Sequence, residues 1–450
     1  MVSILKIKPT SRINILVLSA GFFFFSCSYY ATKSLITKLN KTLGFYSLAL
    51  FYITFAFSNF FSPLVVRRFG TKACMIFGLL LYTGWISSSI KVIEWVFILM
   101  SFLMGIGAGI CWTASGTYLI GCSFKNNIGT NSGIFFFFYL AGNLGGSLLS
   151  SLLLNIAKVS NEVFFLIFTS ISVLGILILF LIVPVETKIP ESKLSVRDNL
   201  MSIFRIYKHK RAILVIPMNI ITGVSIMLVF GLLTLRIPKN SIPNVMMVYG
   251  IANALASMSI GKVIDWLGLK FVLFGCTIVE ICAVIISFWA KSGNPLWLFG
   301  LIFGLFALSG AGLDTALYPL ILHLFPKKIA DVNAAFKFPR SLGTGIAFLL
   351  GSHMRGNISF IIVLILQFIT LLCFIIIDQF IISFNFKKGY KKISDEKNAT
   401  EKKIEDYMDE NENENEDDNN IKDDNNNIQT TKKVFTDYSI SSSESPFSSN

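Results

Sequence analysis

Residues 13–32 read INILVLSAGFFFFSCSYYAT, twenty residues without Asp, Glu, Lys, Arg or His. An α-helix needs about 20 apolar residues to cross roughly 30 Å of hydrocarbon. Inside lipid, every backbone amide must also be satisfied within its own segment. This stretch therefore predicts a transmembrane helix. Ten windows of this kind, each at least 18 residues long, occur along the chain.

The predicted spans form two groups of six around a basic stretch. Two spans are weaker: the ninth, 271–290, contains Glu280, and the eleventh begins near Ala330 but is free of charge only over Ser341–Ser352. Counting both, we predict an all-α membrane protein with twelve transmembrane helices. Its parts are an N-terminal six-helix bundle at 1–185, a basic cytoplasmic linker at 186–211, a C-terminal six-helix bundle at 212–385 and an acidic tail at 386–450.

The basic residues are distributed unevenly, and the distribution predicts the topology. Residues 1–385 carry 29 Lys and Arg against 10 Asp and Glu, whereas the tail carries 10 against 16. In a membrane protein such an excess reports orientation rather than nucleic-acid binding. The N-terminus, the even-numbered loops and the first tail residues hold 24 Lys and Arg; the odd-numbered loops, with Lys33 counted among them, hold nine. Both termini are therefore predicted to be cytoplasmic.

The tail and the loops contain short modification and sorting candidates. Residues 409–427 are polar and of low complexity, which predicts disorder. Tyr390, followed three residues later by Ile393, is typical of a sorting signal. The plasma membrane and the endolysosomal membranes are therefore both candidate locations for the protein. Sequons at Asn40 and Asn357 fall on predicted outer loops and are candidates for N-glycosylation.

Cofactor, metal and catalytic sites are not indicated. The seven cysteines are an odd number without paired spacing, which argues against a disulfide scaffold or a zinc site. The glycine clusters follow no predicted strand, so they do not indicate nucleotide binding; small residues let membrane helices approach closely. Three histidines and no paired intramembrane carboxylates provide no catalytic constellation. We predict a protein that is not an enzyme and that has no cofactor.

The two groups of spans repeat each other. Gly70 and Lys72, between the second and third spans, align with Gly268 and Lys270, between the eighth and ninth, at an offset of 198. The sequence Gly-Ala-Gly at 107–109, in the fourth span, recurs at 310–312, in the tenth, at an offset of 203. Two matches at similar offsets predict a duplicated six-helix unit.

The second copy of this loop, GKVIDWLGLK at 261–270, resembles the loop signature of the major facilitator superfamily. The resemblance implies a glycine that permits a tight turn and an acid and a base that pair across helix ends to latch the cytoplasmic side. The first copy departs from the signature because it has Ser62 and Pro63 in place of the glycine and Arg67 in place of the acid. The signature residues are Gly70, Lys72, Gly261, Asp265, Gly268 and Lys270.

In transporters built from parallel repeats, substrate binds near the midplane between the halves. The resemblance places the first, fourth, seventh and tenth helices around that cavity. Asp314 is the foremost candidate there, because an ionisable residue inside a span is costly and usually functional. It is a candidate proton carrier; the alternative is a helix cap or a bond to a neighbouring Thr. We expect Glu280 to be a partner contact or a shielded structural carboxyl. The candidate cavity residues are Trp112, Tyr118, Asn219, Asp314 and Tyr318.

One stretch is more specific than the fold. Residues 105–143 read GIGAGICWTASGTYLIGCSFKNNIGTNSGIFFFFYLAGN, and with GFYSLALFY at 44–52 they resemble the uncoordinated-93-like family, an ion-channel-regulatory branch of the superfamily. Ser115 and Thr117 stand where that family usually has Gln and Asn. The resemblance implies a regulatory partner of potassium channels, or an escort that traffics receptors, in the lipid bilayer. The alternative is a secondary transporter of a small solute, with proton coupling through Asp314; the sequence identifies no solute.

Overall fold

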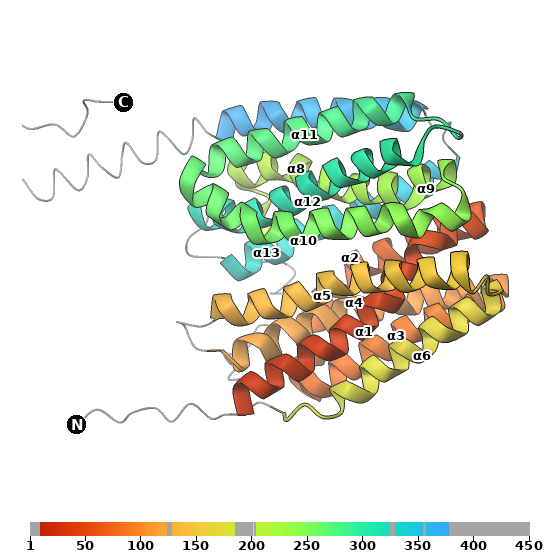
Figure 1. The fold of residues 1–450 in the computed structure, drawn as a ribbon. Coiled ribbons are helices and arrows are strands. Elements are labelled where there is room, and N and C mark those ends of the chain that lie inside the picture. The colour runs from red at the N-terminus through yellow and green to blue at the C-terminus, as the bar shows by residue number, and fades with distance from the viewer. Residues whose placement is uncertain are drawn as a thin grey trace, which may run out of the picture. The chain divides into compact units, whose positions relative to one another are not determined.

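The computed structural model describes residues 10–123, 128–184, 201, 204–324, 329–353 and 357–377, and these ranges consist of helices joined by short turns (Figure 1). Residues Met1–Ile381 form one compact unit. The predicted tail with the motif at Tyr390 and Ile393, and most of the predicted linker, lie outside the described residues. We found no strand within those residues, which agrees with the predicted all-α class.

The N-terminal helices gather on one side of the unit and the C-terminal helices on the other (Figure 1). The first group comprises α1 (Thr10–Leu39), α2 (Lys41–Phe69), α3 (Thr71–Ser88), α4 (Glu94–Gly121), α5 (Ile128–Ser151) with a π-helical extension η1 (Leu152–Ile156), and α6 (Asn161–Leu179). The second comprises α8 (Lys210–Met227) with the π-helical η2 (Leu228–Leu233) and α9 (Thr234–Arg236), the short η3 (Lys239–Ser241), α10 (Ile242–Leu267), α11 (Leu269–Trp289), α12 (Leu296–Leu324), α13 (Ile329–Gly351) and a last helix, Asn357–Ile377.

Ten helices among the described residues are long and apolar enough to cross a membrane. They include α11, whose mean hydropathy of 2.5 outweighs its single Glu280. The helices α3 and α13 are not among the ten. The first contains Lys72 and several polar residues, which lower its mean hydropathy, and the second carries Lys337 and Arg340 within its span. The prediction of a polytopic membrane protein is confirmed.

Small residues let the helices pack backbone to backbone. α1 packs against α5 and α6, and α2 packs against α4. The two groups meet where α2 contacts α13 and where α5 contacts α10. At Gly146, on α5, a Cβ atom would lie 2.3 Å from the carbonyl oxygen of Cys27 on α1. Only glycine permits this approach.

The paired loops make tight turns at glycine. Gly70 ends α2 with φ 81° and Gly268 ends α10 with φ 88°, a backbone region that favours glycine. Gly261 lies inside α10 rather than in the turn. Lys72 Nζ donates to the carbonyl oxygens of Phe180, at 2.7 Å, and Ile182, at 2.8 Å, after α6. A cation at these terminal carbonyls is favourable, so Lys72 fastens α3 to the end of α6.

Both sequons lie at helix starts. Asn40 is exposed and caps α2, because its Oδ1 accepts the Leu43 amide at 3.1 Å. Asn357 is exposed at the first residue of the last helix. N-glycosylation at either position stays a prediction.

Candidate functional site

Lys33, on α1, is buried inside the unit. Its side chain is only 3% exposed, because α1 continues to Leu39 instead of ending in a loop near residue 32. The sequence count that placed Lys33 in an outer loop is therefore wrong. Without Lys33 the odd-numbered loops are still poorer in basic residues than predicted, so the positive-inside argument is strengthened.

Aromatic rings surround the Lys33 ammonium. Its Nζ donates to the Tyr52 hydroxyl at 2.8 Å and lies 4.0 Å from the ring centre of Phe230. The ring centres of Tyr52, Tyr29 and Tyr30 lie 5.4, 5.6 and 5.9 Å from the same Nζ atom. Each ring face attracts a cation. We call Lys33 with these four rings the lysine cage; it draws on α1, α2 and η2, so both groups of helices contribute.

The lysine cage has no carboxylate of its own. Among the described residues, none forms an ion pair with Lys33. A buried charge without a counter-ion is costly, which is why such a residue is a functional candidate. Phe230 also belongs to a π-helical turn, a rare geometry that occurs frequently at functional sites.

Asp314 lies near the lysine cage, but Arg340 neutralises it. The Arg340 guanidinium, on α13, binds both carboxylate oxygens of Asp314, on α12, with one contact of 2.9 Å. Their side chains are 28% and 42% exposed, respectively. Arg340 is close enough for its charge to interact with Lys33, and both charges of the pair reach Tyr30. The sequence analysis considered a cap or a Thr bond for Asp314 and did not anticipate this ion pair.

The other predicted cavity residues lie in several places. The Trp112 ring meets Tyr139 edge-on at 4.9 Å, and Tyr139 accepts a hydrogen bond from the Tyr30 hydroxyl at 3.2 Å, so Trp112 borders the lysine cage. Tyr118 instead donates to the Val183 carbonyl after α6 at 2.8 Å. Asn219 donates to the Val215 carbonyl of its own helix at 3.0 Å. The side chain of Tyr318 lies outside the described part of the chain.

Hydrogen bonds join the two groups of helices beside the lysine cage. Thr37 Oγ1, one turn after Lys33, donates to the Phe230 carbonyl at 2.9 Å and lies 3.2 Å from Thr234 Oγ1. Lys38 Nζ donates to the Leu235 carbonyl at 2.8 Å. We call these contacts the α1 clamp. They hold α1 to η2 and α9 at the end of the unit where α1 terminates.

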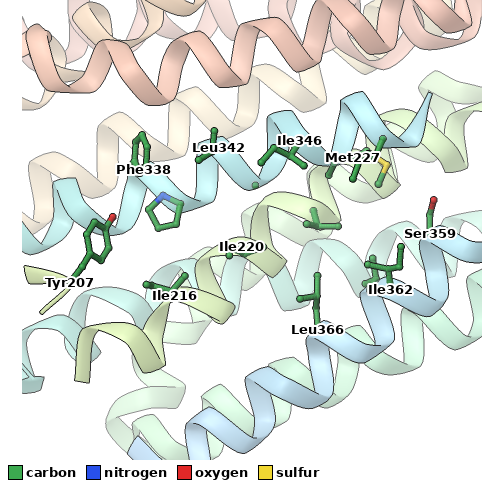
Figure 2. Close-up of a pocket in the computed structure, with 16 residues that line it drawn as sticks. Tyr207, Ile216, Ile220, Met227, Phe338, Leu342, Ile346, Ser359, Ile362 and Leu366 are labelled. Atoms are coloured by element: carbon green, nitrogen blue, oxygen red, sulfur yellow. The ribbon is translucent and has the colours of Figure 1, made fainter. Parts of the chain in front are cut away.

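An apolar groove of about 440 Å³ runs between α8, α13 and the last helix (Figure 2). Figure 2 shows Tyr207 at one end and Ser359 at the other, with Leu342, Ile346, Ile220 and Leu366 between them. Every lining residue between those two ends is apolar. The groove therefore suits hydrocarbon, whereas the buried charge of Lys33 makes the lysine cage the candidate functional site.

A comparison with protein families identifies the chain. The model of the family described as ion channel regulatory protein UNC-93 matches residues 35–375. The chain belongs to the UNC-93 family. The match begins just after the lysine cage's own Lys33 and covers the remaining helices through nearly all of Asn357–Ile377. The resemblance noted from residues 44–52 and 105–143 is thereby confirmed.

Curated UNC-93 relatives are similar over different lengths. "UNC93-like protein MFSD11" of Xenopus laevis is 35% identical over 189 residues, which cover 39% of this chain and 42% of that protein. "UNC93-like protein 3" of Arabidopsis thaliana is 24% identical over 383 residues, 78% of this chain and 82% of that protein. "Protein unc-93 homolog A" of Homo sapiens is 25% identical over 394 residues, which cover 74% of this chain and 86% of that protein. The matched part thus spans less than half of the frog relative.

Solved transporter structures share the fold. A D-xylose-proton symporter superposes with a TM-score of 0.62 at 13% identity, covering 81% of this chain and 96% of that one. A POT family transporter in complex with 5-aminolevulinic acid reaches 0.65 at 13% identity, covering 82% and 96%. At such identity the likeness shows the fold alone. The UNC-93 chain therefore has a transporter-like fold, and its family and fold are those of regulatory proteins or transporters.

A double-mutant cycle should detect the Asp314–Arg340 pair. We expect Asp314→Asn and Arg340→Gln each to lower the free energy of unfolding, because each leaves one charge of the pair uncompensated. The double variant should recover a coupling energy of about 1 kcal/mol, a small value because both side chains are partly exposed. Thermal unfolding in detergent micelles measures all four proteins. Additive effects would mean that the contact contributes nothing to stability.

Proposed function

We propose that this UNC-93 protein is an accessory membrane subunit that regulates or traffics an ion channel or a receptor, and that it is not an enzyme. The observation that carries the proposal is the UNC-93 match over residues 35–375, because that family is described as ion channel regulatory. A potassium channel is the partner class that the sequence resemblance implied. The similarity to human unc-93 homolog A over 86% of that protein supports the same assignment.

For the membrane arrangement, we propose twelve spans in two pseudo-repeated six-helix bundles. The ten apolar helices would be completed by α3 and α13, which α4 and α2 would shield from lipid through their packing contacts. Matching positive φ angles at Gly70 and Gly268 support the repeat. The basic-residue asymmetry supports cytoplasmic termini, in the plasma membrane or an endolysosomal membrane.

Native co-purification tests the regulatory role. A tagged protein is solubilised in mild detergent, and its partners are identified and quantified by mass spectrometry beside Asp314→Asn and Lys33→Met variants. We expect an ion-channel or receptor subunit in stoichiometric amount, and equally so with both variants, because Lys33 is buried and Asp314 is bound by Arg340 within the same chain. Recovery of the chain alone from cells that express it natively would contradict the regulatory role.

The second candidate is transport of a small solute by alternating access, and the lysine cage favours it. The cage lies between the two groups of helices, where transporters of this fold bind substrate. Lys33 and Arg340 bring two positive charges against the one negative charge of Asp314, within an aromatic wall. This balance favours an anionic organic solute, which would neutralise Lys33 on binding.

Uptake into proteoliposomes distinguishes the two candidates. A panel of radiolabelled organic carboxylates is tested with the wild type and with Lys33→Met, and exposed Lys91→Met serves as the matched control. Transport predicts uptake that Lys33→Met abolishes and Lys91→Met retains. Uptake that is identical in all three proteins, or absent from all three, would exclude the cage as an anion site for transport.

A further inference from the structure

Glu280 is the most deeply buried acidic residue that the structure describes. It lies on α11, and its side chain is 1% exposed. Ser309 Oγ, on α12, donates to its Oε2 at 2.8 Å, and Ser225 Oγ, on α8, is hydrogen-bonded to its Oε1. These contacts exclude the expected role of Glu280 as a partner contact, since the carboxyl faces the interior of the C-terminal helices.

No basic side chain neutralises this carboxyl. Among the described residues, none forms an ion pair with Glu280. The charged group that interacts with it electrostatically is Asp314, which is also acidic. The last helix, Asn357–Ile377, has no acidic or basic residue. Apart from Asp314, the charged residues on the packed elements lie in the first or last turns of their helices. They are Lys210 and Arg211 on α8, Arg236 on α9, Lys262 and Asp265 on α10, and Lys270 on α11; Lys337 and Arg340 lie on the neighbouring α13. An unpaired carboxylate buried here would cost several kcal/mol.

The Ser225 hydroxyl indicates which group supplies the hydrogen in its contact with Glu280. Its Oγ also lies 2.9 Å from the carbonyl oxygen of Ile221, which can only accept. A hydroxyl has a single hydrogen to donate. When that hydrogen serves Ile221, the contact between Ser225 and Glu280 needs a hydrogen on the carboxyl. A protonated Glu280 satisfies all of these contacts at once.

Gln367 is the fourth polar side chain of this cluster. It is fully buried on the last helix and interacts with Glu280, yet neither atom of its amide has a hydrogen-bond partner of good geometry. A buried unpaired amide requires an explanation. Because the single carboxyl hydrogen is already assigned to the Ser225 contact, the carboxyl can only accept a hydrogen bond from the Gln367 amide nitrogen. A metal ion fits less well, because Ser309 already contacts the carboxyl directly at 2.8 Å.

We propose that Glu280 is a buried proton-binding site, occupied in this conformation, formed with Ser225, Ser309 and Gln367. Release of the proton leaves a carboxylate that must be hydrated or paired, so it must loosen the packing of α8, α11, α12 and the last helix. The protein therefore senses protons through Glu280, whereas Asp314 forms an ion pair with Arg340. This inference goes beyond the proposed function and applies whether the protein regulates a partner or carries a solute.

Infrared difference spectroscopy of the purified protein in lipid nanodiscs at pH 7 tests the proposal. We expect the wild type to show the C=O absorption of a protonated carboxylic acid and Glu280→Gln to lack it. Asp314→Asn is the matched control, because it removes the other intramembrane carboxyl of this region and should keep the acid absorption. An acid absorption that is unchanged in Glu280→Gln would overturn the proposal, as would its absence from the wild type.

Ser309→Ala provides the second variant, because it keeps Glu280 and deletes a single hydroxyl. The lost hydrogen bond to Oε2 should shift the acid C=O absorption to higher frequency without removing it. If Glu280→Gln does not fold, this shift assigns the absorption to Glu280. An acid absorption at the same frequency in Ser309→Ala and the wild type would overturn the proposal.

Discussion

Lys33→Met is expected to stabilise the protein, raising its free energy of unfolding by about 1–4 kcal/mol. The lysine ammonium is 3% exposed and has no carboxylate partner among the described residues. Removing it from water costs several kcal/mol, and the aromatic rings offset only part of this cost. Methionine has a similar length and fits irregular apolar space without a charge. Thermal unfolding of the purified protein measures the gain.

The matched control is Lys91→Met, because Lys91 is exposed and its replacement should leave stability unchanged within about 0.5 kcal/mol. A gain in stability with a loss of function is typical of a residue kept for activity. If Lys33→Met instead lowered the melting temperature, the hydrogen bond to Tyr52 and the contact with Phe230 would outweigh the desolvation of Lys33. The lysine cage would then be a structural feature.

Gly146→Ala is expected to be strongly destabilising, by about 3 kcal/mol or more. Its Cβ would lie 2.3 Å from the Cys27 carbonyl oxygen and 2.9 Å from the Cys27 Cα. Both are backbone atoms of α1, so no side-chain rotation relieves the overlap. The two helices must move apart, which disrupts the packing along α1 and α5. The measurements are the melting temperature and the yield of monodisperse protein on size exclusion.

Gly116→Ala isolates the effect of this contact. Gly116 lies on α4, and a Cβ there would meet nothing within 4 Å. Both substitutions add the same helix propensity, about 1 kcal/mol in favour of alanine, so their difference measures the overlap alone. Equal melting temperatures for Gly146→Ala and Gly116→Ala would show that α1 and α5 do not approach as closely as described here.

The membrane-spanning helices were predictable because hydrophobicity is a local property of the sequence. Stretches such as 13–32 and 42–66 are helical in the structure, as predicted. Charge and mean hydropathy do not select the same ten helices: α3 overlaps a predicted charge-free window but is not among the ten apolar helices, whereas α11 with Glu280 is. The turn glycines Gly70 and Gly268 were also predictable, because a two-residue match in both loops marks them.

The candidate site was predictable only in part. Asp314 was recognised because a lone acid inside a span is conspicuous, but Arg340 was not predicted as its partner. Lys33 was missed because it directly follows a charge-free window, where a lysine usually flanks a helix at the membrane surface. The signal that could have found it is its position six residues before Leu39, where the helix ends, among Tyr29, Tyr30 and Thr37.

The sequence by itself determined that this is a helical multi-pass membrane protein of the UNC-93 family, because spans and family motifs are read from adjacent residues. Only the tertiary structure decided which charges are buried and which are paired. Lys33 meets Phe230 across nearly two hundred residues, and Glu280 meets Ser225 and Ser309 from two other helices. Such contacts depend on how helices pack and which faces they bury, and no local pattern of residues encodes the neighbour that a side chain finds there.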